Sequence, residues 1–207
     1  YYKPNIKFNF KIKNKIKFFF KKLLPSIFSS GVTQINILVG TIIASFQSGA
    51  VSYLYYADRV YQINLAIAGI AVGTVSLPIL SKAFQKKDYS KVSNIQNKSI
   101  ELSLLLSIPA SLGLIISSKE IISGLFGYGS FTIQDVEMTS NALKFFGYGV
   151  IAFALVKILA NFFFARDNTK IPFYISSFIV FFNVVLSLTF FNDIGFLIIP
   201  IATSIST

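Results

Sequence analysis

Long runs of apolar residues, separated by short polar connections, make up most of the chain after about residue 25. A helix rises about 1.5 Å per residue, so about 20 apolar residues cross the hydrocarbon core of a bilayer. The pattern predicts an all-α, polytopic transmembrane helix bundle with five full spans and a truncated sixth. The predicted helices occupy approximately residues 25–46, 52–80, 99–118, 139–165, 171–191 and 195–207.

The first two spans form a hairpin around a very short turn at residues 48–52. The second span is longer than a bilayer needs, so it should tilt or protrude into water at its far end. Small residues at helical spacing predict close helix packing on both spans. They are Gly40, Ala44 and Ser48 on the first span, and Gly69 and Gly73 on the second.

Composition agrees with a membrane protein, since 54% of the residues are hydrophobic and only 13% are charged. The sequence contains no histidine and no cysteine. It therefore offers neither the commonest general base nor a thiolate for catalysis or metal binding. We expect no enzymatic activity and no resident cofactor.

Residues 1–22 form a basic segment with eight lysines and no acidic residue. Such a segment could bind anionic lipid headgroups, or nucleic acid through its phosphates. Because it leads directly into a hydrophobic span, we favour membrane lipids and expect no nucleic acid. A solvated cytoplasmic linker whose charge only fixes topology is the alternative.

The distribution of cations predicts the orientation of the bundle. With the N-terminus in the cytoplasm, the inner segments hold fifteen lysines and arginines, whereas the outer segments hold only Lys119. This asymmetry satisfies the positive-inside rule. Residues 82–98 are then a cytoplasmic loop, and residues 119–137 are an interfacial loop on the outer side.

Two cations lie inside predicted spans, where a charged side chain is costly and marks a candidate functional site. Arg59, in the second span, follows Asp58, which cannot neutralise it along the helix face because sequence neighbours point about 100° apart. Lys157, in the fourth span, shares a face with Lys144 and Asn161. Both cations are candidates for burial at membrane depth, and snorkelling to the nearer interface is the alternative for each.

The third span carries a line of serines at i, i+4 spacing: Ser99, Ser103, Ser107 and Ser111. Hydroxyls in line on one helix face make either the polar wall of a cavity or a hydrogen-bonded seam between helices. The sequence favours neither alternative.

Five segments carry a more specific signal: GVTQINILVGTIIASF, SGAVSYLYYADRVYQ, GIAVGTVSLPILSK, LFGYGSFT and LVKILANFFFARDNTKIP. In this order they closely resemble the lipid II flippase MurJ (MviN) family of the MOP exporter superfamily. The resemblance covers nearly all of residues 23–207 and implies the second six-helix lobe of a two-lobe, fourteen-helix protein. Residues 1–22 would then be the linker between the lobes.

The resemblance also implies a mechanism. Lipid II, the undecaprenyl-diphosphate-linked peptidoglycan precursor, would move from the inner to the outer leaflet of the bacterial cytoplasmic membrane by alternating access between the two lobes. Arg59 matches the arginine that follows YYAD in the family, and its planar fork suits diphosphate oxygens. We expect Arg59, Asp58, Lys157 and Asn161 to line the substrate cavity, opposite a first lobe that lies outside this chain.

Some members of the family bind sodium, and Asn183 and Thr203 match two of its ligand positions. Gly40 stands where the family often has an acid, and Ser187 replaces another polar position. These departures weaken the expectation of a sodium site.

Three functions compete at this point. The first is the second lobe of a lipid II flippase. The second is another MOP-type exporter, of a polyprenyl-linked glycan or a drug, against which YYADR and DNTKIP argue. The third is a non-transporting remnant, which is suggested by a chain that begins with Tyr1 and resembles one lobe only.

Overall fold

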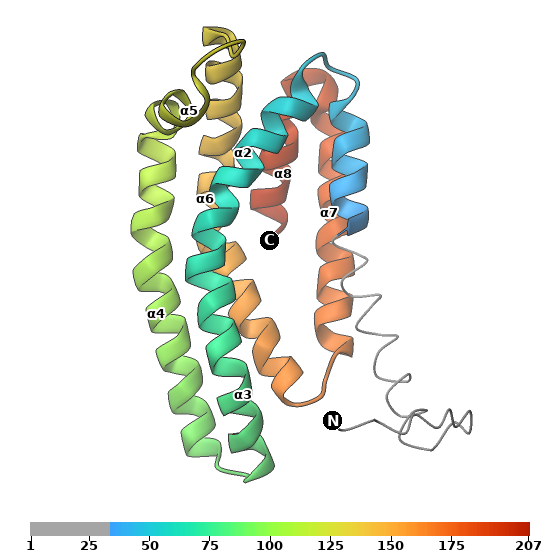
Figure 1. Cartoon of the computed structure of the whole chain (residues 1–207). Helices are drawn as coiled ribbons and strands as arrows, with labels where there is room; N and C mark the ends of the chain where they lie inside the picture. Colours follow the sequence, from blue (N-terminus) through green and yellow to red (C-terminus); the bar gives the residue numbers. More distant parts are fainter. Residues whose placement is uncertain (1–33) are drawn as a thin grey trace, which may run out of the picture.

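The computed structural model describes residues 34–207, which are helical apart from short turns (Figure 1). The predicted linker 1–22, and the first span before residue 34, lie outside the described residues. After a helix at Gln34–Ala44, the elements are α2 (Ala50–Leu65), η1 (Ala66–Ala71), α3 (Val72–Gln85), α4 (Tyr89–Ile116), α5 (Ser118–Phe126), α6 (Ile133–Ala165), α7 (Lys170–Ile194), η2 (Gly195–Leu197) and α8 (Ile198–Ser206). The all-α fold class predicted from the hydropathy pattern is right.

Four stretches of the described chain are long and apolar enough to cross a membrane: Ala50–Gln85, Tyr89–Ile116, Ile133–Ala165 and Lys170–Ser206. The fourth stretch contains a reversal at Gly195, whose φ of 72° is a conformation that glycine adopts without strain. After this turn α8 runs back alongside α7 (Figure 1). Its nine residues are too few to cross a bilayer.

The second predicted span is a continuous helix of 36 residues, with a π-helical turn, η1, in its middle. Gly69 of η1 is buried against α6, where a side chain at Gly69 would lie 3.1 Å from the Cα of Ala154. One turn later, the side-chain amide of Asn161 fills the space where a side chain at Gly73 would lie. The GxxxG pair therefore serves helix packing, as its spacing predicts. The π-helical turn itself was not predicted.

The two loops predicted from polarity are largely helical, so both predictions are wrong. Residues 86–88 alone separate α3 from α4, because the Asp88 side chain accepts a hydrogen bond of 3.0 Å from the backbone N–H of Lys91 and caps α4. The outer loop contains α5, and a capping box between Thr132 and Asp135 starts α6 at Ile133. Hydropathy locates the membrane-embedded part of a helix, whereas caps set its ends.

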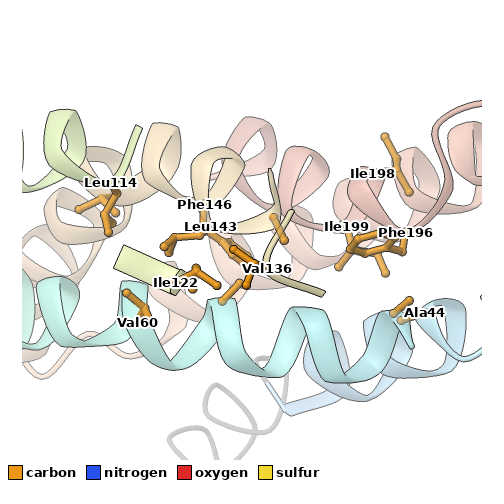
Figure 2. Packing of buried hydrophobic residues seen from close by; sticks show 14 of the residues in the cluster. Ala44, Val60, Leu114, Ile122, Val136, Leu143, Phe146, Phe196, Ile198 and Ile199 are labelled. Atoms are coloured by element: carbon orange, nitrogen blue, oxygen red, sulfur yellow. The ribbon is translucent and has the colours of Figure 1, made fainter. Parts of the chain in front are cut away.

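The core is built around α6, which packs against α2, α3, α4, α5 and α8. Side chains from α2, α4, α5, α6 and α8 meet in one cluster (Figure 2), which includes Val60, Leu114, Ile122, Leu143, Phe146 and Ile199. By contrast α7 packs chiefly on α8. The cluster fixes how α2 and α6, which carry the cations predicted to lie in spans, are placed relative to each other.

The close contact at Gly69 predicts the effect of adding one methyl group. We expect Gly69→Ala to destabilise the fold by about 1–3 kcal/mol, because Ala154 backbone atoms would have to give way. Gly113→Ala on α4 is the matched control, since a methyl group there meets no atom within 4 Å. Thermal unfolding in detergent, followed by circular dichroism, would measure both. Equal midpoints for the two variants would contradict the packing at Gly69.

Candidate functional site

Arg59 projects from the outer surface of α2, and its side chain is exposed in the described bundle. It lies nine residues after Ala50, or about 14 Å of helix rise from the start of α2. The guanidinium carbon is 4.7 Å from the centroid of the Tyr55 ring, one turn earlier on the same helix. A cation over an aromatic face is partly stabilised but keeps its hydrogen-bond donors. Arg59 is therefore not buried by the described residues, and its place in a cavity shared with another lobe stays a prediction.

Asp58 is turned to a different partner. Its carboxylate accepts a hydrogen bond from the side-chain amide of Gln62, one turn later on α2, and it is half-buried. Gln62 thus satisfies Asp58 along its own helix face, as i and i+4 neighbours do. Arg59 keeps its positive charge available at the surface of the bundle.

Lys157 and Asn161 lie together on α6, against η1 and α3. A side chain at Gly69 would lie 3.5 Å from the Cβ of Lys157, and Asn161 fills the space beside Gly73. Lys157 is exposed beyond this contact, so the described residues do not bury it either. Gly69 lies about ten residues after Arg59 on the continuous α2–η1 helix, which is about 15 Å of helix rise. Because Lys157 contacts Gly69, it lies about 15 Å from Arg59 in depth. The two cations therefore lie at different depths.

The physical reason for both exposed cations lies in the extent of the bundle. A helix that packs on one side only presents its opposite side outward, whatever residues that side carries. Within residues 34–207 the other elements leave uncovered the parts of α2 and α6 that carry Arg59 and Lys157. The sequence predicted cations at membrane depth but could not reveal which side of each helix the remaining helices cover.

The serine line of α4 is buried in the bundle and does not form the wall of an open cavity. Ser111 donates a hydrogen bond of 2.8 Å to the carbonyl oxygen of Gly147 on α6, and Ser99 bonds within its own helix to the Ile95 carbonyl. The hydroxyls of Ser103 and Ser107 make no hydrogen bond. The line is thus an interhelical seam in which small side chains permit close approach and one hydroxyl links two helices.

Asn183 and Thr203, the residues aligned with sodium ligands, are brought together by the turn at Gly195. The Asn183 amide nitrogen donates a hydrogen bond of 2.9 Å to the Thr203 hydroxyl, which donates one of 2.7 Å to the Ile199 carbonyl. The Ser187 hydroxyl lies 3.4 Å from the amide oxygen of Asn183. These bonds join α7 to α8 and satisfy the polar groups of both helices.

The donor set around Asn183 does not fit a cation well. Hard cations are held by several oxygen ligands, commonly including carboxylates. Gly40 provides no oxygen on a side chain and packs near Ile199, and the described residues hold no cluster of three acidic, histidine or cysteine side chains.

Sequence reasoning missed the interactions that fix the end of the bundle at which α2 and α6 begin. The Tyr53 hydroxyl donates a hydrogen bond of 2.9 Å to Asp135, which joins α2 to the first turn of α6. The Gln47 side chain accepts one of 2.9 Å from the backbone N–H of Phe196, across 149 residues of sequence. The Thr132 and Asp135 spacing is a readable capping signal. No local pattern predicts the partners of Tyr53 or Gln47.

Comparison with known proteins gives a consistent result. The family model described as "Lipid II flippase MurJ" matches residues 2–207. The probable lipid II flippase MurJ of Rhizobium meliloti (strain 1021) is 41% identical over 172 residues, which cover 83% of this chain and 32% of that protein. The Rickettsia prowazekii (strain Madrid E) relative is 40% identical over 190 residues, covering 90% and 38%. The chain spans about a third of the length of these curated relatives.

Solved structures agree with this comparison. A lipid II flippase MurJ in an inward closed conformation superimposes with a TM-score of 0.81 at 29% identity, over 97% of this chain and 42% of that one. An outward-facing multidrug resistance MATE family transporter of the MOP superfamily gives a TM-score of 0.76 at 18% identity, over 88% and 40%. The latter likeness shows the fold alone.

Proposed function

Because this chain belongs to the lipid II flippase MurJ family, we propose that it forms part of a flippase that carries lipid II from the inner to the outer leaflet. Family membership and four stretches long enough to span a bilayer make it a multi-pass protein of the bacterial inner membrane. In this proposal the chain is one helical lobe, and the rest of the transporter supplies the other.

The observation that supports the proposal best is the exposed guanidinium of Arg59 on an apolar, membrane-length helix. An arginine that faced hydrocarbon would cost at least about 2.5–3.5 kcal/mol. A diphosphate offers several oxygens to the planar fork of donors, and such charge-assisted bonds are strong. The diphosphate of lipid II would thus compensate a charge that the described bundle leaves exposed.

Lys157 and Asn161 have a secondary place in this proposal. Lys157 lies deeper than Arg59 along the helix axis, so one phosphate group cannot contact both cations at once. We propose that Lys157 contacts the substrate headgroup at another stage of the transport cycle, and that Asn161 positions it by packing into Gly73. Asp58 would keep Arg59 free by bonding to Gln62 instead.

The orientation of the bundle is also a proposal and rests on its charge asymmetry. We expect the α3–α4 turn to face the cytoplasm and the α5 end to face outward. The chain contains no cysteine, so each introduced cysteine is the only thiol. Cysteines at Ser48 and Ser130 should react with an impermeant maleimide in intact cells, and one at Ser90 only after permeabilisation. Labelling at Ser90 in intact cells would reverse the orientation.

The proposed role of Arg59 predicts a strict requirement for its side chain. The test uses a chimera in which this chain replaces the matching segment of the Rickettsia prowazekii relative, expressed in cells depleted of their own flippase. Rescue of growth by the chimera is expected, and its failure at normal protein levels would favour a non-transporting remnant. Arg59→Ala should abolish the rescue, and Arg59→Lys should restore little, because an ammonium lacks the planar fork.

Lys119→Ala, which removes an exposed cation from α5 and not from α2, is the matched control and should rescue fully. The protein level of every variant is measured by immunoblot, so that loss of function is separated from loss of expression. Full rescue by Arg59→Lys would show that charge alone suffices and would refute recognition through the guanidinium fork.

A further inference from the structure

The segment YYADR, which ends at Arg59, places an aromatic residue and a cation one helical turn apart. Tyr55 and Arg59 are i and i+4 on α2, so their side chains share one face of the helix. A long side chain in a helix points back toward the N-terminus of that helix. Arg59 therefore extends over the turn that carries Tyr55, and its guanidinium carbon lies 4.7 Å from the ring centroid.

The Tyr55 ring has an aromatic neighbour of its own. The rings of Tyr55 and Tyr56 meet edge to face, with centroids 6.0 Å apart and an interplanar angle of 79°. This is one of the arrangements that the charge distribution of aromatic rings favours. The contact with Tyr56 limits the orientations of the Tyr55 ring, on which Arg59 lies.

Tyr56 in turn joins α2 to α5 and to the connection between α5 and α6. Its ring centroid lies 4.8 Å from that of Phe126, the last residue of α5, and 5.4 Å from that of Phe131, to which it is perpendicular. Phe126 and Phe131 also meet each other at 6.3 Å, and both pack against the main buried cluster. A continuous set of ring contacts therefore runs from the core through Tyr56 and Tyr55 to Arg59.

These contacts leave the donors of Arg59 free. An aromatic ring attracts a cation through its face, whereas the five N–H donors of a guanidinium lie in the guanidinium plane. The neighbouring acid, Asp58, accepts its hydrogen bond from Gln62 and does not draw the guanidinium away from Tyr55. The guanidinium is thus held near one position and can still donate to a ligand.

We propose that Tyr55 is a positioning residue, whose ring orients the Arg59 guanidinium for the diphosphate of lipid II. This inference rests on the proposed function of Arg59. A long, flexible side chain loses conformational freedom when it binds a ligand, and that loss weakens binding. The Tyr55 ring restricts Arg59 before the substrate arrives, so less freedom is lost when the planar fork meets the phosphate oxygens. The ring carries this role, and the hydroxyl does not.

The inference is tested by measuring lipid II binding to the Rickettsia prowazekii chimera with native mass spectrometry. Tyr55→Leu and Tyr55→Gln remove the ring and should weaken binding by about 2- to 12-fold, which corresponds to about 0.5–1.5 kcal/mol for one immobilised side chain. Tyr55→Phe keeps the ring and should bind as the original chimera does. A loss in Tyr55→Phe equal to that in Tyr55→Leu would assign the effect to the hydroxyl and overturn the proposal.

A double-mutant cycle separates positioning from a direct contact with the substrate or a structural role. In a chimera that already carries Arg59→Ala, Tyr55→Leu should cause no further loss, because the ring acts only through the guanidinium. A further loss in that background would refute the positioning role. The matched control is Tyr174→Leu, which removes an exposed ring from α7 that packs beside Phe173 and should leave binding unchanged.

The outcomes distinguish this inference from the function on which it rests. Weaker binding by Arg59→Ala together with unchanged binding by Tyr55→Leu would overturn the positioning role alone. Unchanged binding by Arg59→Ala would refute both. The thermal midpoint of each variant, followed by circular dichroism in detergent, shows that a loss of binding is not a loss of fold.

Discussion

Polar groups inside a bilayer must find partners within the protein, because hydrocarbon offers none. The described chain meets this requirement at most of its polar positions. Ser111 bonds to the Gly147 carbonyl, Asn183 bonds to Thr203, and each bond joins two helices. Gly69 and Gly73 allow η1 and α3 to pack closely on α6. The same requirement makes the exposed cations informative.

Arg59 and Lys157 are exposed on helices whose composition is that of membrane spans. A bundle that left these two charges in contact with lipid would be destabilised. Arg59 and Lys157 therefore need polar or anionic partners from outside residues 34–207. The chain spans about a third of the length of its curated relatives. A lobe that exposes charge at membrane depth is consistent with a transporter whose substrate site lies between two lobes. Because the exposed charges are positive, such a site requires a substrate with an anionic headgroup.

Much of the fold could be predicted from periodicity and charge, because span length and small-residue spacing are local properties of the sequence. The all-α class, the long second span and the packing role of Gly69 and Gly73 followed from them. Helix ends were harder, since Asp88 and Thr132 extend helices into stretches that polarity marks as loops. The burial of the serine line, the π-helical turn and the partners of Tyr53 depend on how distant helices pack, which no single segment encodes.

The candidate site was predicted only in part. Sequence placed Arg59 and Lys157 inside spans, and the resemblance aligned Asn183 with Thr203, which the structure joins by a hydrogen bond. The exposure of both cations is a property of the packed bundle, and the separation of their depths follows from the packing of α6 on η1. The central claim is that Arg59 binds the diphosphate of lipid II.

Native mass spectrometry of lipid II bound to the Rickettsia chimera tests this claim most directly. The account predicts at least about tenfold weaker binding for Arg59→Ala than for Lys119→Ala, the loss expected for a charge-assisted hydrogen bond. Equal lipid II binding by the two variants would contradict it.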